Sequence, residues 1–171
     1  MKIPLKPSLL KIRRKSPRWI ILHHTAEIYD DPAATIANTK FQMPAIAKGV
    51  LEKKQGDVNY HYIVDKIGED FQPIVCRPFV FMCDWPDIRP DVNNAAVHIA
   101  VLGNFDFKVP EKRLYEILCF RLINPMLKMW GLSPSRVKFH KDVSTDKDLS
   151  CPGDFIDMAV VQAMIRRFVI K

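Results

Sequence analysis

Ala95-Ala-Val-His-Ile-Ala-Val-Leu102 is an almost unbroken apolar run, and Gly103-Asn104 follows it. Strands that are buried on both faces read as continuous apolar stretches, whereas a strand with one face in water alternates. The run therefore predicts the central strand of a sheet, which ends at the glycine. Within this strand, His98 is expected to be a core histidine whose ring is satisfied by hydrogen bonding.

Four other segments predict strands around this central strand, and a fifth predicts a turn. Trp19 to Leu22 is a short apolar run, which is typical of a buried strand. Residues 58–65 alternate and are rich in β-branched and aromatic side chains; residues 66–68 then indicate a turn and residues 70–75 a partner strand. Residues 137–140 form one more short apolar strand.

The remaining segments predict helices and one long loop. Residues 32–51 have a helical pattern, and residues 110–130 place apolar side chains on one helical face, with a bend at Asn124-Pro125. Residues 76–94 are rich in Pro, Asp and Asn, and long ordered loops of this kind often carry function. The predicted buried face of a terminal helix at residues 154–170 consists of Ile156, Ala159, Val160, Ala163, Met164 and Phe168. Strands and helices mixed around one sheet predict a single α/β domain.

The composition is that of an ordinary globular domain. The 171 residues are 48% hydrophobic and 26% charged, and no apolar run approaches the ~20 residues that a membrane span needs. The net charge of +7 favours polyanionic partners, of which nucleic acid and the bacterial envelope are two. The charge is spread along the chain, so a solvated basic surface is an equal alternative. Because no nucleic-acid-binding motif is present, nucleic acid is not an expected partner.

The amino-terminal segment, residues 1–17, is basic and contains three prolines. It predicts an irregular lead-in on the surface, followed by one domain at residues 18–171. The apolar stretch that comes next is too short for the core of a signal peptide, and no small-residue cleavage site follows it. We therefore expect no Sec export signal, and four cysteines that are free or metal-bound rather than paired in disulfides.

Two histidines and one cysteine occupy positions that suggest chemistry. His23 follows the first apolar strand, His140 ends another, and Cys151 comes eleven residues after His140 in Ser150-Cys-Pro-Gly153. Imidazole nitrogens and a thiolate are good zinc ligands, and three protein ligands leave a fourth position for water, as in catalytic zinc sites. The alternative is a capped histidine at a strand end together with an unrelated buried cysteine. The residues alone leave both interpretations open.

Four segments in order give the sequence a specific resemblance. It resembles the N-acetylmuramoyl-L-alanine amidase family, which phage endolysins, bacterial amidases and animal peptidoglycan recognition proteins share. The matching segments are Trp19-Ile-Ile-Leu-His-His-Thr-Ala26, Asn59-Tyr-His-Tyr-Ile-Val-Asp65, the stretch from Asn94 to Asp106 and the stretch from Val137 to Asp154. The resemblance implies a central mixed β-sheet flanked by helices. It also implies zinc-dependent hydrolysis of the amide between N-acetylmuramic acid and L-alanine in peptidoglycan.

The resemblance also assigns residues to roles. It implies that His23, His140 and Cys151 bind Zn²⁺ and that Tyr60 is catalytic, through a hydrogen bond to the developing oxyanion or to the water. The alternative for Tyr60 is a strand tyrosine packed beside the site. His24 should point to the opposite side of its strand, because side chains alternate, and should serve packing or hydrogen bonding there.

Several positions depart from the family pattern. Leu149 stands where some members have a catalytic lysine. The gap between the second and third ligands looks longer than usual and contains Lys147, a second catalytic candidate whose alternative is a solvated loop residue. Cys83 or Asp84 takes the place of a substrate-binding histidine, and Asn94 is a further substrate-binding candidate. His98 occupies a position that is usually glycine.

These departures keep other functions open. A non-catalytic peptidoglycan-binding module of the same fold is the main alternative, and a cysteine hydrolase that uses Cys151 with His140 as its base is another. For the amidase we expect a monomer without a membrane span. It would be made in the cytoplasm and reach the bacterial wall at lysis or through a holin-like route.

Overall fold

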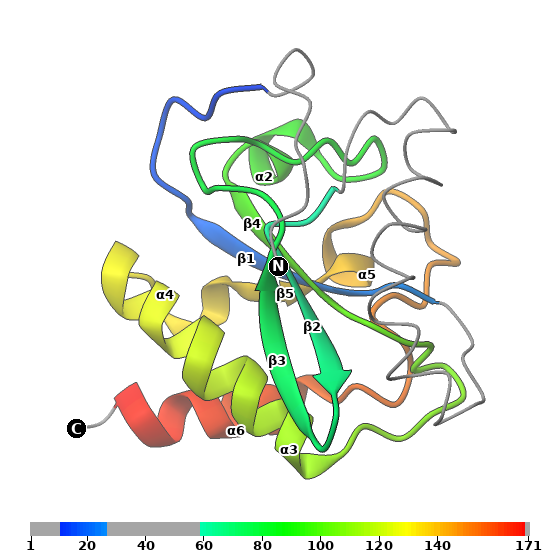
Figure 1. The fold of residues 1–171 in the computed structure, drawn as a ribbon. Helices are drawn as coiled ribbons and strands as arrows, with labels where there is room; N and C mark the ends of the chain where they lie inside the picture. Colours follow the sequence, from blue (N-terminus) through cyan, green and yellow to red (C-terminus); the bar gives the residue numbers. More distant parts are fainter. Residues whose placement is uncertain (1–10, 27–58, 170–171) are drawn as a thin grey trace.

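The computed structural model describes residues 11–26 and 59–169, and these form one five-stranded sheet in the order β3-β2-β4-β1-β5 (Figure 1). The strands are β1 (Trp19–His24), β2 (Tyr62–Ile67), β3 (Asp70–Val75), β4 (Ala96–Val101) and β5 (Val137–Phe139). β4 pairs in parallel with β1 and β2, β5 pairs in parallel with β1, and β3 is antiparallel to β2. The predicted mixed sheet is confirmed, with the apolar run of β4 at its centre.

The helices follow the strands in short segments. They are α2 (Pro90–Asn93), α3 (Lys112–Glu116), a π-helical segment (Ile117–Ile123), α4 (Asn124–Trp130), a 3₁₀ turn (Pro134–Arg136), α5 (His140–Val143) and α6 (Met158–Val169). At the predicted bend, the wide π-helical turns directly precede α4. A proline ring clashes with the carbonyl group four residues earlier and disturbs a regular α-helix. The π-helical turns lie where Pro125 would have this effect. Gly131 adopts φ 62° and ends α4, as its sequence position predicts.

The sheet has two chemically different faces. One face packs against α3, the π-helical segment, α4 and α6, which lie together in Figure 1, and forms the main apolar core. From β4 this core takes Val97, Ile99 and Val101. The alternate side chains of the sheet, His23 and His98 among them, point to the opposite face. The polar chemistry of the chain therefore lies on the face away from the large helices.

The buried face predicted for the terminal helix is confirmed in part, since Ile156 is buried and Val160 and Met164 pack against the core. The side chain of Phe168 lies outside the described residues. Val161 and Ile165 are fully buried, whereas Ala159 and Ala163 are exposed. Val161 and Ile165 are four residues apart, so they lie on the same face of the helix. The observed buried face is rotated from the predicted one by about one residue position. Alanine buries little apolar area, so the larger β-branched side chains decide which way the helix faces.

In the described part of the amino-terminal segment, residues 11–17, two side chains are buried and five are exposed. Ile12 forms a bridge with Phe81, and Pro17 is buried. Arg13 is only 8% exposed, and its guanidinium donates to the carbonyl oxygens of Phe79, Asn94 and Ala96. A guanidinium carries five donors, so it can satisfy several buried carbonyls at once. This segment therefore joins the loop at residues 79–81 to the start of β4.

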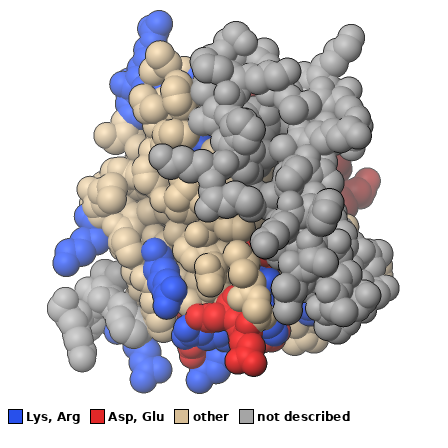
Figure 2. Space-filling view, in the orientation of Figure 1, with Lys and Arg blue, Asp and Glu red and all other residues tan. Residues whose placement is uncertain are grey.

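Positive charge on the surface is distributed rather than gathered in one block. Figure 2 shows Lys and Arg side chains over several parts of the face that it draws, in keeping with charge spread along the sequence. No helix among the described residues is long and apolar enough to cross a membrane. The helix predicted at residues 32–51 lies outside the described residues.

Candidate metal centre

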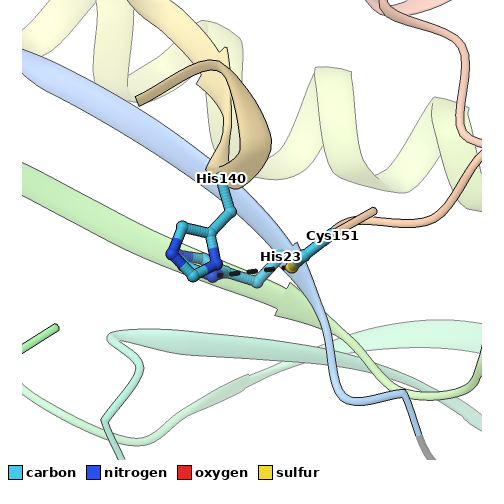
Figure 3. Close-up of side chains that lie close together, drawn as sticks. All are labelled: His23, His140 and Cys151. Carbon is cyan, nitrogen blue, oxygen red and sulfur yellow. Dashed lines mark hydrogen bonds between the residues drawn. The ribbon is translucent and has the colours of Figure 1, made fainter. Parts of the chain in front are cut away.

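His23, His140 and Cys151 come together from three different elements (Figure 3). His23 lies near the carboxyl end of β1, His140 begins α5 directly after β5, and Cys151 lies in the loop before α6. Because β1 and β5 are parallel neighbours, their carboxyl ends meet at one edge of the sheet. Nitrogen and sulfur atoms of the three residues lie within 4.8 Å of one another, and all three residues are buried.

The spacing and chemistry of these atoms fit a zinc ion. Usual zinc–sulfur and zinc–nitrogen bond lengths at a tetrahedral angle place the two donor atoms about 3.6 Å apart. Sγ of Cys151 lies 3.9 Å from Nδ1 of His23, which is close to that separation. Two imidazoles and one thiol also form a donor set that binds zinc in preference to cations that favour oxygen ligands.

Burial determines the protonation of all three residues. Burial lowers the pKa of His23 well below its ordinary value, and the neighbouring histidines lower it further. The pKa of His140 is also lowered by burial, although the nearby carboxylate of Asp87 opposes the shift. Neutral imidazoles keep a free lone pair for a metal. Burial raises the pKa of the Cys151 thiol to about 12, so without a cation it carries its proton.

The high pKa of Cys151 argues against the cysteine hydrolase. A nucleophilic cysteine needs a lowered pKa, because the thiolate is the reactive form. Here the thiol is buried, and the backbone N–H of His24 approaches its sulfur at 3.4 Å. A hydrogen bond from that N–H stabilises a thiolate when a nearby cation offsets the unfavourable desolvation of the charge. The environment suits a metal ligand better than a free nucleophile.

The loop that carries Cys151 is braced by the segment after β4. Gly153 adopts φ +101°, and a Cβ atom there would lie 2.5 Å from the backbone carbonyl carbon of Phe105. The backbone N–H of Phe155 donates to the Phe105 carbonyl at 3.0 Å, and the Ser150 hydroxyl donates to Asp106 at 3.0 Å. The position of Cys151 thus depends on a close backbone contact that only glycine permits.

The side chain of His24, on the opposite side of β1 from His23, contacts the same segment after β4. Its Nδ1 accepts a hydrogen bond from the backbone N–H of Phe105 at 3.2 Å, and its Nε2 lies 3.9 Å from the Asp106 carboxylate. The side chain therefore bonds to the segment after β4, as the alternation along the strand predicts.

Aromatic side chains surround His23. The ring of Trp85 stacks on His23 with centroids 4.6 Å apart and planes 22° apart, and the ring of Tyr60 lies 5.4 Å away edge-on. Trp85 is anchored by its indole N–H, which donates to the carbonyl oxygen of Asn59 at 3.1 Å. Tyr60 thus lies beside the candidate metal ligand His23.

Trp85 and Asp87 are site residues that no motif marks. Oδ2 of Asp87 lies 2.8 Å from Nε2 of His140 and accepts a hydrogen bond from the Ser144 hydroxyl at 2.9 Å. A carboxylate beside the second nitrogen of a metal-binding histidine commonly orients its ring. Both residues belong to the loop at 76–94, so the only signal in the sequence is the length and composition of that loop.

The substrate-binding candidates have other partners than the three candidate metal ligands. Cys83 is buried, with Sγ 3.2 Å from Nδ1 of His61. Asp84 is exposed and pairs with Lys11 at 2.8 Å. Asn94 precedes the amino end of β4, and its backbone carbonyl accepts from Arg13 at 3.3 Å. The roles of Cys83, Asp84 and Asn94 in substrate binding stay predictions.

Lys147 is exposed in the loop between α5 and Cys151. Among the described residues it has neither a hydrogen bond nor an ion pair, so its contacts give it no link to the metal centre. Leu149, at the position of the family lysine, is half-buried.

Solved structures with the same fold come from phage, bacteria and animals. An N-acetylmuramoyl-L-alanine amidase, LysC, from Clostridium intestinale URNW has a TM-score of 0.71 at 21% identity, covering 96% of this chain and 95% of its own. An endolysin from a Thermus scotoductus bacteriophage has a TM-score of 0.64 at 20% identity, covering 94% and 92%. Drosophila peptidoglycan recognition protein SD has a TM-score of 0.67 at 20% identity, covering 90% and 83%.

The sequence itself carries the family assignment. No curated protein sequence matches the chain in a direct search. A family model described as N-acetylmuramoyl-L-alanine amidase, however, matches residues 13–154. This match includes the three candidate metal ligands, Tyr60 and the buried Arg13. The chain therefore belongs to the N-acetylmuramoyl-L-alanine amidase family.

Proposed function

We propose that the protein is a zinc-dependent amidase that hydrolyses the bond between N-acetylmuramic acid and L-alanine in peptidoglycan. The observation that carries this proposal is the grouping of His23, His140 and Cys151, whose donor atoms lie within 4.8 Å of one another. A family member that only binds peptidoglycan has no need of this donor set. The bacterial cell wall is the proposed site of action, reached at lysis or through a holin-like route, and the proposed active form is a monomer.

The residues around the metal centre have distinct tasks in this reaction. A zinc ion held by the three residues would supply Lewis acidity to the scissile carbonyl and activate a water molecule. His23 and His140 present neutral nitrogens, and the His24 N–H supports the Cys151 thiolate. Tyr60, whose ring lies beside His23, donates a hydrogen bond from its phenolic O–H to the oxyanion that develops on the carbonyl oxygen. Stacked on His23, Trp85 covers one side of that ring and limits the access of bulk water.

Replacement of Tyr60 by phenylalanine is expected to slow hydrolysis by about 10²-fold while zinc remains bound, because one oxyanion donor is lost. Steady-state rates and the zinc content of the purified variant measure the two effects separately. A variant with full activity would show that Tyr60 only packs beside the site.

Zinc affinity is expected to rise about tenfold per pH unit between roughly pH 5.5 and 6.5, because binding displaces one proton from Cys151. The direction of this pH dependence follows from the pKa values of the metal-free protein. The thiol, with its pKa raised to about 12, is protonated throughout this range. The two histidines, with pKa values lowered by burial, contribute few protons. Competition with a chelator of known affinity measures the slope, and a flat profile would contradict a role for Cys151 as a ligand.

Digestion of purified peptidoglycan tests the proposed reaction directly. The expected products are intact glycan strands and free stem peptides that begin with an L-alanine amino group, which mass spectrometry identifies. Peptides that remain attached to glycan, on walls that nevertheless bind the protein, would instead support the non-catalytic binding module.

A further inference from the structure

His98 is a buried histidine beside the metal-binding residue His23. Nδ1 of His98 lies 2.9 Å from Nε2 of His23, and the two residues are 0% and 1% exposed. In the parallel pairing of β1 with β4, Ile21 lies opposite His98 and His23 lies opposite Ala100. The two histidines are therefore diagonal neighbours on one face of the sheet, and the contact joins two central strands rather than mobile loops.

The two ring nitrogens of His23 face different partners. Nδ1 faces Sγ of Cys151 at 3.9 Å, on the side where the donor atoms gather, and Nε2 faces His98. A neutral imidazole that offers the lone pair of Nδ1 to a metal carries its proton on Nε2. In this tautomer, the Nε2–H of His23 donates to Nδ1 of His98, which accepts without a proton of its own.

Buried hydrogen bonds hold the backbone around His98. Its backbone N–H donates to Nδ1 of His61 at 3.0 Å. Nε2 of the same ring lies 2.9 Å from the carbonyl oxygen of Phe81 and 3.2 Å from a guanidinium nitrogen of Arg13. Arg13 donates to the carbonyl of Ala96 at 2.7 Å, two residues before His98. These contacts anchor the strand that carries the acceptor of the His23 proton.

We infer that His98 is a positioning residue for the metal centre, because its Nδ1 fixes both the tautomer and the ring orientation of His23. The inference rests on the proposed zinc function, since it concerns how one ligand is presented to the ion. A metal-binding histidine usually donates its second ring proton to a neighbouring acceptor, and loss of that acceptor weakens metal binding about 10- to 100-fold.

Zinc affinity of three full-length variants tests this role. Competition with a chromogenic chelator gives the dissociation constant of the wild-type protein, His98→Ala, His98→Asn and the control Cys119→Ala. His98→Ala is expected to bind zinc about 10- to 100-fold more weakly. His98→Asn keeps an acceptor oxygen near the place of Nδ1 and is expected to recover most of the loss. Cys119 is equally buried but packs in the helix layer, so its variant should bind like the wild type.

The outcomes separate this inference from the proposed function. A wild-type protein that binds no zinc would overturn the proposed function. A wild-type protein that binds zinc, with His98→Ala binding as tightly, would overturn the role of His98 and leave the proposed function intact. An equal loss of zinc affinity in His98→Ala and Cys119→Ala would show that both variants only lose stability. That result would also overturn the role of His98.

Nitrogen NMR of the histidine rings decides the question if His98→Ala does not fold. In the zinc-loaded wild-type protein, His23 should carry its proton on Nε2, and Nδ1 of His98 should be unprotonated. A proton on Nδ1 of His98 would reverse the direction of the hydrogen bond and contradict the inference.

Discussion

The variant Cys151→Ser is expected to lose zinc and amide hydrolysis together, with a fall in rate of about 10³-fold or more. A bound zinc ion stabilises charge in the transition state by several kcal/mol, which corresponds to a factor of this size. A serine hydroxyl does not replace a thiolate as a ligand near neutral pH, and two imidazoles alone leave the site incomplete. Metal analysis after gel filtration and the rate of amino-group release from peptidoglycan measure the two losses.

The control for this variant is Cys119→Ala. Cys119 is fully buried in the main core beside the large helices, and its sulfur lies 3.9 Å from the carbonyl oxygen of Val161. We expect its zinc content and rate to match those of the wild type, apart from a modest loss of stability. Full activity in Cys151→Ser would show that the cysteine is not a required ligand.

The variant Gly153→Ala is expected to lower the free energy of unfolding by roughly 3 kcal/mol and to weaken zinc binding. Its Cβ would lie 2.5 Å from the backbone carbonyl carbon of Phe105, and φ is +101°. Backbone cannot move aside as a flexible side chain can, so the loop must shift and take Cys151 with it. Urea denaturation and chelator competition measure the two effects.

Gly131→Ala provides a matched control for this variant. Gly131 also has a positive φ, +62°, but a Cβ there would meet no atom within 4 Å. We expect only the conformational cost of about 1 kcal/mol and unchanged zinc affinity. If the two variants bind zinc alike, the close approach of Gly153 to Phe105 does not set the position of Cys151.

The parts of the fold that follow from the sequence are those in which one physical effect dominates. The continuous apolar run of β4 indicates burial on both faces, and the run of β1 indicates the same. Gly131 lies directly after a helical apolar pattern and ends the helix in the structure as predicted. His23 and His140 each follow or end an apolar strand, so the meeting of parallel strand ends brings the two histidines together.

The features that could not be predicted from the sequence depend on contacts between segments that are distant along the chain. Trp85 and Asp87 reach the site because a long loop folds over the sheet, and loop paths leave no periodic signal. The burial of Arg13 depends on three carbonyls that lie about 66 to 83 residues away along the chain. The contact between His98 and His23 arises from strand register, which becomes visible only when the order of the strands is known.

The most direct test of the account is hydrolysis of purified peptidoglycan before chelation, after chelation and after zinc is restored. Chelation is expected to abolish the release of L-alanine amino groups, and about one zinc ion per chain is expected to restore it. Undiminished release by protein shown to be free of metal would contradict the zinc amidase at its centre.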